Sequence, residues 1–138
     1  SDFSIADRFG VSAIKDTYAR AFNEWKHDYK YLTELVMVLN WKCWDFYYKG
    51  NDEYSTLYSK LYYEASDYAG ENLSGDAARY YFETAYLTYN KDIEFLKDYG
   101  YFLVEEGDSR QAAEIFTKLV EMDPWNEEYI SMADRLKG

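Results

Sequence analysis

The sequence offers little nucleophilic or metal-binding chemistry. It contains one cysteine, Cys43, and one histidine, His27. A nucleophilic site needs a nucleophile beside an oriented base, and a metal site needs several convergent His, Cys or carboxylate ligands. His27 is surrounded by charged residues, and Cys43 lies in an apolar stretch, where a thiol behaves as a small hydrophobic group. We therefore expect no catalytic residue, no cofactor and no metal.

Carboxylates are the remaining candidates for chemistry. Glu94 and Asp98 are four residues apart, which places both on one face of a helix, and paired carboxylates can serve acid–base catalysis. Glu105, Glu106 and Asp108 cluster near a glycine but lack the ordered ligand spacing of a calcium loop. Carboxylates on helices commonly just face water. We therefore expect that the chain is not an enzyme.

The charge of the chain is strongly negative and uneven. The formal net charge is −11. Residues 1–58 carry seven Lys or Arg against nine Asp or Glu, a net of −2, whereas residues 59–138 carry eight against seventeen, a net of −9. Phosphate backbones and anionic lipids repel such a surface. We expect no direct nucleic-acid or membrane binding and favour a basic protein partner, although the acidity also suits plain solubility.

Several features predict a cytoplasmic protein. A single cysteine allows no intramolecular disulfide, as is usual in a reducing compartment. The longest apolar run, residues 35–39, is far shorter than a membrane span. The first residues do not show the basic region and apolar stretch of a signal peptide.

Apolar residues recur at three- and four-residue steps, which is the period of helices with one buried face. The only proline is Pro124, so long helices are favoured. We predict an all-α fold without strands. About seven helices are expected, after a short turn that stops at Gly10: 13–25, 29–48, 51–70, 76–89, 92–106, 109–122 and 127–137. The helix over 29–48 is apolar around most of its circumference and should be covered on two sides.

The C-terminal half repeats itself with a period of 34 residues. Residues 59–92 superimpose on 93–126 without a gap, so that Ser66 matches Gly100, Ala78 matches Ala112, and Phe82 matches Phe116. Each copy reads as a helix, a tight turn and a second helix. Small residues let two antiparallel helices approach closely, and the aromatic ring fills the space beside them.

Over residues 59–137 the chain resembles the tetratricopeptide repeat family. The second hairpin carries the pattern in Gly100, Gly107-Asp108, Ala112, Phe116 and Asp123-Pro124. The first hairpin matches through Ala78, Phe82 and Ala85, with Asn90 at the place of the proline. The resemblance implies about two hairpins and a C-terminal capping helix over 59–138. An N-terminal helical bundle over 1–58 would continue into them as one compact unit.

The resemblance also implies a binding surface, because first helices of such hairpins line a groove that holds a partner peptide. Few basic groups lie on those helices, so an apolar or basic ligand is favoured over a carboxylate. Tyrosine gives much contact area for little lost rotamer freedom, although the same rings also suit the core between repeats. The candidate partner-binding residues are Tyr86, Tyr89, Phe95, Tyr99, Phe102, Glu94 and Asp98.

The N-terminal part resembles small uncharacterised helical proteins encoded by mobile elements of Gram-positive bacteria, through Arg8-Phe9-Gly10, residues 21–26 and residues 31–40. Two hypotheses follow. The leading one is a non-catalytic bacterial adaptor or scaffold module that binds another protein. The alternative is a small acidic inhibitor of the anti-CRISPR type, which mimics nucleic acid and binds a basic host protein. Whether two copies of the chain associate is left open.

Overall fold

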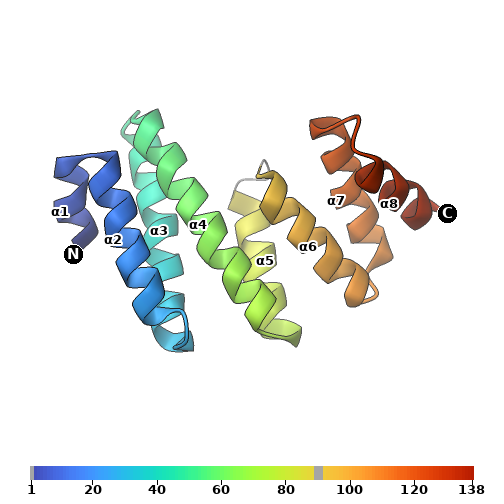
Figure 1. The fold of residues 1–138 in the computed structure, drawn as a ribbon, viewed down its shortest axis with the longest axis horizontal. Helices are drawn as coiled ribbons and strands as arrows, with labels where there is room; N and C mark the ends of the chain where they lie inside the picture. Colours follow the sequence, from blue (N-terminus) through green and yellow to red (C-terminus); the bar gives the residue numbers. More distant parts are fainter. Residues whose placement is uncertain (1, 89–91) are drawn as a thin grey trace. The chain divides into compact units, whose positions relative to one another are not determined.

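The computed structural model describes residues 2–88 and 92–138, and these residues form helices and no strands. Within these described ranges, eight helices follow one another along the chain (Figure 1). Their bounds are α1 Asp2–Phe9, α2 Val11–Trp25, α3 Tyr29–Tyr48, α4 Asp52–Asn72, α5 Gly75–Thr88, α6 Ile93–Glu105, α7 Ser109–Met122 and α8 Glu127–Lys137. The predicted all-α fold is confirmed. No described helix is both long and apolar enough to span a membrane.

The helix ends follow local capping chemistry. The side chains of Asp92 and Asp108 accept hydrogen bonds from the backbone N–H of Phe95 and Gln111, at 3.0 and 3.2 Å, as N-cap residues do. The segment before Gly10 differs from its prediction, because it is the complete helix α1 rather than a short turn. Gly10 ends it with a φ of 110°, a backbone conformation that favours glycine.

The chain divides into two compact units, Ser1–Ala69 and Gly70–Gly138, and the division falls within α4. In the first unit, α2 packs against both α1 and α3. Its core contains fully buried Ile14, Leu35, Leu39 and Cys43. The predicted extent of the N-terminal segment, 1–58, and its union with the repeats in one compact unit stay predictions.

A buried charged group in the first unit holds α1 in place. The Lys42 side chain is almost fully buried and donates to the carboxylate of Asp7, and the Tyr58 hydroxyl donates to the other oxygen of the same carboxylate. The Lys42 ammonium also lies 5.6 Å from the ring centre of Phe46 and 5.8 Å from that of Tyr58. These partners compensate the loss of hydration that a buried cation suffers.

In the second unit α7 packs against both α6 and α8. Ala112 and Phe116 of α7 are completely buried, as the repeat predicts. Gly100 of α6 faces Phe116 so closely that an added Cβ would lie 2.9 Å from its Cε2 atom. The helix predicted to cap the last repeat is present as α8, with Tyr129, Met132 and Ala133 buried.

Candidate functional site

An acidic cleft of about 390 Å³ opens in the second unit. Its wall is built by the last turn of α4, the start of α5 and one face of α6. The α6 residues Asp98, Tyr101, Phe102 and Glu105 line it. They follow steps of three and four residues, so one helical face carries them all.

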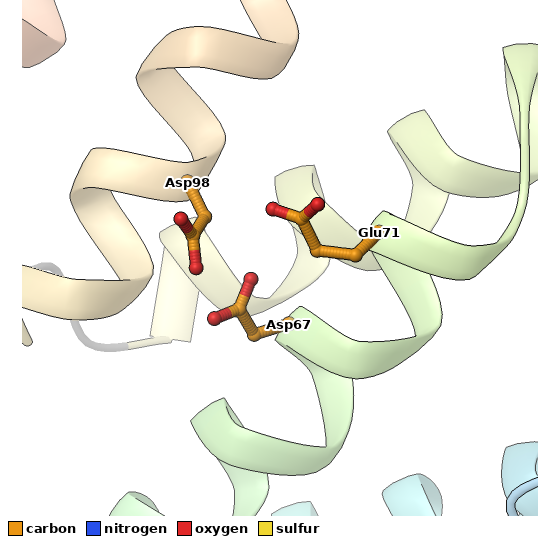
Figure 2. A group of neighbouring side chains, drawn as sticks. All are labelled: Asp67, Glu71 and Asp98. Atoms are coloured by element: carbon orange, nitrogen blue, oxygen red, sulfur yellow. The ribbon is translucent and has the colours of Figure 1, made fainter.

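Four carboxylates surround the cleft. They belong to Glu71, Asp98, Glu105 and Glu106, and among the described residues that line it there is no lysine or arginine. Figure 2 shows the carboxylates of Glu71 on α4 and Asp98 on α6 turned toward one another, and one oxygen of each lies within 4.8 Å of the other. Asp67, also drawn there, precedes Glu71 by one turn of α4. The cleft therefore favours a cation.

The ionisation of Glu71 reflects this crowding. Partial burial raises the pKa of its carboxyl above the ordinary value, and the negative charges of Asp98 and Glu105 raise it further. A carboxylate among like charges is harder to ionise, and a cation placed beside it would remove that penalty. The electrostatics of the cleft thus suit a positively charged guest.

Aromatic rings form the other part of the wall. Phe82, Tyr101 and Phe102 line the cleft, and the ring centres of Phe82 and Phe102 are 4.9 Å apart. Phe82 fits because Gly70 has no side chain: a Cβ added there would overlap the ring. Aromatic faces attract cations electrostatically, so rings beside carboxylates suit a lysine or arginine side chain.

A hydrogen bond to α8 holds the cleft residue Tyr101 in place. The Tyr101 hydroxyl donates to the Glu128 carboxylate at 2.6 Å. Burial, followed by this hydrogen bond, raises the pKa of Tyr101 to about 12. The Tyr101 ring also stands edge-on to Phe116, with ring centres 5.2 Å apart. Its orientation is therefore fixed from two sides before any guest binds.

The structure separates the residues predicted to contact a partner. Asp98 and Phe102 line the cleft, whereas Phe95 and Tyr99 are buried and pack near Phe82. Tyr86 is half-buried, with its ring centre 5.4 Å from that of Tyr99. Glu94 is exposed and does not line the cleft, and Tyr89 lies outside the described residues. The binding role of these residues stays a prediction.

Sequence reasoning missed Glu71 and Tyr101 as members of a site. The repeat itself held a signal for the first, because the 34-residue offset places Glu71 at the position of Glu105. Tyr101 was visible as one of four α6 residues on a common face. The facing carboxylates of Glu71 and Asp98 provide fewer ligands than the roughly six to eight oxygens that calcium takes. The expected absence of a metal stays a prediction.

Comparisons with known proteins support the repeat. Residues 62–126 match the family model "YpiA-like, C-terminal tetratricopeptide repeats". The chain is 31% identical over 103 residues to the "TPR repeat-containing protein YpiA" of Bacillus subtilis (strain 168). This alignment covers 75% of the chain but only 22% of that relative, so the chain spans about a fifth of its length. No solved structure matches.

Proposed function

We propose that this chain, which is a tetratricopeptide-repeat-like protein, binds a basic segment of a partner protein in the acidic cleft of its second unit. Proteins of this repeat family are generally non-catalytic and serve protein–protein interaction. One observation carries the proposal: four carboxylates and three aromatic rings line one cleft on this fold. The module would act as an adaptor in the cytoplasm.

The cleft suits a lysine or arginine side chain better than a free ion. Its carboxylates can each accept a charge-assisted hydrogen bond from an ammonium or guanidinium group. Tyr101 and Phe102 offer ring faces to the apolar part of such a side chain. Arg79 illustrates the preference within the chain, because its guanidinium lies 5.9 Å from the ring centre of Phe102 and pairs with Glu83 at 3.1 Å.

Calorimetric titration with a short peptide of alternating arginine and alanine tests the proposal. The Asp98→Asn, Glu105→Gln double variant removes two cleft carboxylates. The matched control is Glu114→Gln, Glu121→Gln, which removes two exposed carboxylates of α7 that do not line the cleft. A charge-assisted hydrogen bond contributes about 1.5–3 kcal/mol, so the cleft variant should bind at least about tenfold more weakly. The control should bind like the parent chain.

The aromatic part is tested separately at Tyr101. Tyr101→Phe keeps the ring and loses the hydroxyl that bonds to Glu128, so affinity for the peptide should persist. Tyr101→Ala removes the ring and should weaken binding by about 0.5–2 kcal/mol, the range of a cation–aromatic contact. Circular dichroism of each variant establishes that it is folded. Equal weakening by the cleft variant and its control, or equal binding of a glutamate-rich peptide, would reject the proposal.

A further inference from the structure

A pocket of about 280 Å³, here called the apolar pocket, opens in the first unit, and none of its lining residues belongs to the acidic cleft. Its wall is built where α2 packs against both α1 and α3. Helix α2 contributes residues 17, 20, 21, 24 and 25. These residues follow steps of three, one, three and one, so they share one face of the helix. The pocket therefore results from the packing of helices and does not depend on a loop.

The floor of the apolar pocket is hydrophobic. Phe3 of α1 is 5% exposed and Leu35 of α3 is fully buried, and the half-buried Ala21, Trp25 and Val38 continue the wall. The volume lies just below the range of about 300–1,000 Å³ of pockets that enclose a drug-sized ligand. The pocket therefore suits a single large apolar side chain.

Charged side chains form the rim of the apolar pocket. Asp2, Glu24 and Glu34 supply three carboxylates and Arg20 supplies one guanidinium group, and all four residues are exposed. Three negative charges against one positive charge leave the rim at −2. In the part of the chain that the structure describes, no ion pair engages Arg20, Glu24 or Glu34. The rim therefore offers carboxylates for a cation beside a hydrophobic floor.

Helix α3 takes part in the pocket through residues 34, 35 and 38. Met37 and Trp41 of the same helix are each 63% exposed and do not line the pocket. The prediction that the helix over 29–48 is covered on two sides therefore does not hold within the first unit. The apolar pocket is a concave site, separate from this exposed face.

The combination of floor and rim selects the chemistry of an occupant. An apolar side chain would exclude water from Phe3 and Leu35, which is favourable. A lysine or arginine next to it in sequence would bring a cation to Glu24 and Glu34. An acidic segment would be repelled, and an uncharged one would leave the carboxylates without a counter-charge. Arg20 can donate hydrogen bonds to a backbone carbonyl of the bound segment.

We propose that the apolar pocket binds one large apolar side chain of a partner protein, in a segment where lysine or arginine flanks that side chain. The acidic cleft of the second unit needs only basic side chains, so the two sites recognise different features of a partner. This inference does not rest on the function proposed for the cleft, because all residues of the pocket lie in the first unit.

Calorimetric titration with three short peptides tests the proposal. The protein is the Asp98→Asn, Glu105→Gln variant, in which the acidic cleft is weakened. The first peptide carries a leucine between two arginines, the second has alanine in place of the leucine, and the third has serine in place of the arginines. The second should bind at least about tenfold more weakly than the first, because it cannot bury a leucine side chain. The third should bind about threefold or more weakly, because it lacks the cations.

Two results of these titrations would overturn the proposal. One is a leucine–arginine peptide that does not bind up to about 1 mM. The other is binding of that peptide no tighter than either of its two relatives. Neither result bears on the acidic cleft, which is tested by the arginine–alanine peptide on the parent chain.

Charge removal at the rim tests the cationic part. Glu24→Gln, Glu34→Gln, added to the cleft variant, removes two rim carboxylates and should weaken binding of the leucine–arginine peptide by about threefold or more. The matched control is Glu53→Gln, Glu64→Gln, which removes two exposed carboxylates of the first unit that do not line the pocket. The control should bind like the cleft variant itself. Circular dichroism establishes that each protein is folded, and equal weakening by rim variant and control would overturn the proposal.

The indole N–H signal of Trp25 locates the bound peptide. Trp25 lines the pocket, whereas Trp125 is 90% exposed in the second unit. Proton–nitrogen correlation spectra of Trp25→Phe and Trp125→Phe assign the two signals by their loss. Titration with the leucine–arginine peptide should shift the Trp25 signal and leave the Trp125 signal in place. A Trp25 signal that does not move at saturation would overturn the proposal.

Discussion

Phe116 packs against the backbone of Gly100, so that a Cβ at residue 100 would lie 2.9 Å from the ring atom Cε2. Phe82 makes the equivalent approach to Gly70, where an added Cβ would overlap its ring. The 34-residue repeat pairs the two phenylalanines but matches Gly100 with Ser66, one turn before Gly70. Close helix approach thus persists in both hairpins although the glycine has moved by one turn.

Gly100→Val should destabilise the second unit. The new side chain would meet Phe116 and Ile115, which are completely buried and have no room to shift. Overpacking of this kind costs about 1–3 kcal/mol of unfolding free energy. Ser131→Val on the exposed side of α8 is the control for adding a β-branched residue to a helix. Urea denaturation measures both, and a Gly100→Val chain as stable as the parent would show that the interhelical contact is misplaced.

Asp7→Ala should destabilise the first unit through Lys42. The variant leaves the buried ammonium without its carboxylate and the Tyr58 hydroxyl without its acceptor. Loss of one partner of a buried pair costs about 3–5 kcal/mol, whereas replacing both partners by apolar residues is often nearly neutral. Thermal unfolding should therefore show Asp7→Ala far below the parent and the triple variant Asp7→Leu, Lys42→Met, Tyr58→Phe, which removes all three polar partners, close to it. Equal losses in the two proteins would contradict this account.

The positions of helices could be predicted from the sequence where capping residues and close packing determine them. The helix over 29–48 has the predicted bounds because Asp28 caps it and Gly50 follows it with a φ of 77°. The second hairpin followed from Gly100, Ala112 and Phe116, whose types are fixed by close packing. Lys42 could not be foreseen in the same way, since its partner Asp7 is 35 residues away.

The candidate site was predictable only in part. Asp98 and Phe102 were chosen from sequence and line the cleft. Phe95 and Tyr99 were chosen for the same reason, but neighbouring aromatic residues on one helix can face either core or groove, and these two face the core. Glu71 was missed although the 34-residue offset matches it with Glu105, because the linear sequence does not show that it lies beside Asp98.

The stability of the chain should respond to pH through Glu71. Its pKa is raised in the folded state by burial and by Asp98 and Glu105, so the folded state holds this proton more tightly than the unfolded state does. Ionisation of Glu71 therefore lowers the free energy of unfolding. This loss is absent below the ordinary glutamate pKa and appears as the pH rises through the pKa of the folded state. Glu71→Gln should therefore unfold like the parent in acid and be more stable at neutral pH. Urea titrations at several pH values measure this difference.

Glu114→Gln controls for the loss of one negative charge outside the cleft. Its difference from the parent should not grow over the same pH interval as that of Glu71→Gln. Addition of the arginine–alanine peptide should reduce the advantage of Glu71→Gln at neutral pH, because the cation stabilises the ionised carboxyl. A Glu71→Gln chain that is less stable than the parent at neutral pH would contradict the electrostatic description of the cleft.

The salt dependence of peptide binding should distinguish the acidic cleft from a nucleic-acid mimic. In a cleft that combines carboxylates with aromatic rings, added salt weakens only the electrostatic contribution to the binding free energy. The reason is that the screening length falls from about 10 Å at 0.1 M to about 3 Å at 1 M. We expect a moderate loss of affinity, with the remainder depending on Tyr101. An inhibitor that imitates nucleic acid would instead use its acidic surface as a whole. Its binding would collapse in salt, and Glu114→Gln, Glu121→Gln would weaken it as much as Asp98→Asn, Glu105→Gln. Titrations of all three proteins at low and high salt decide between the two hypotheses.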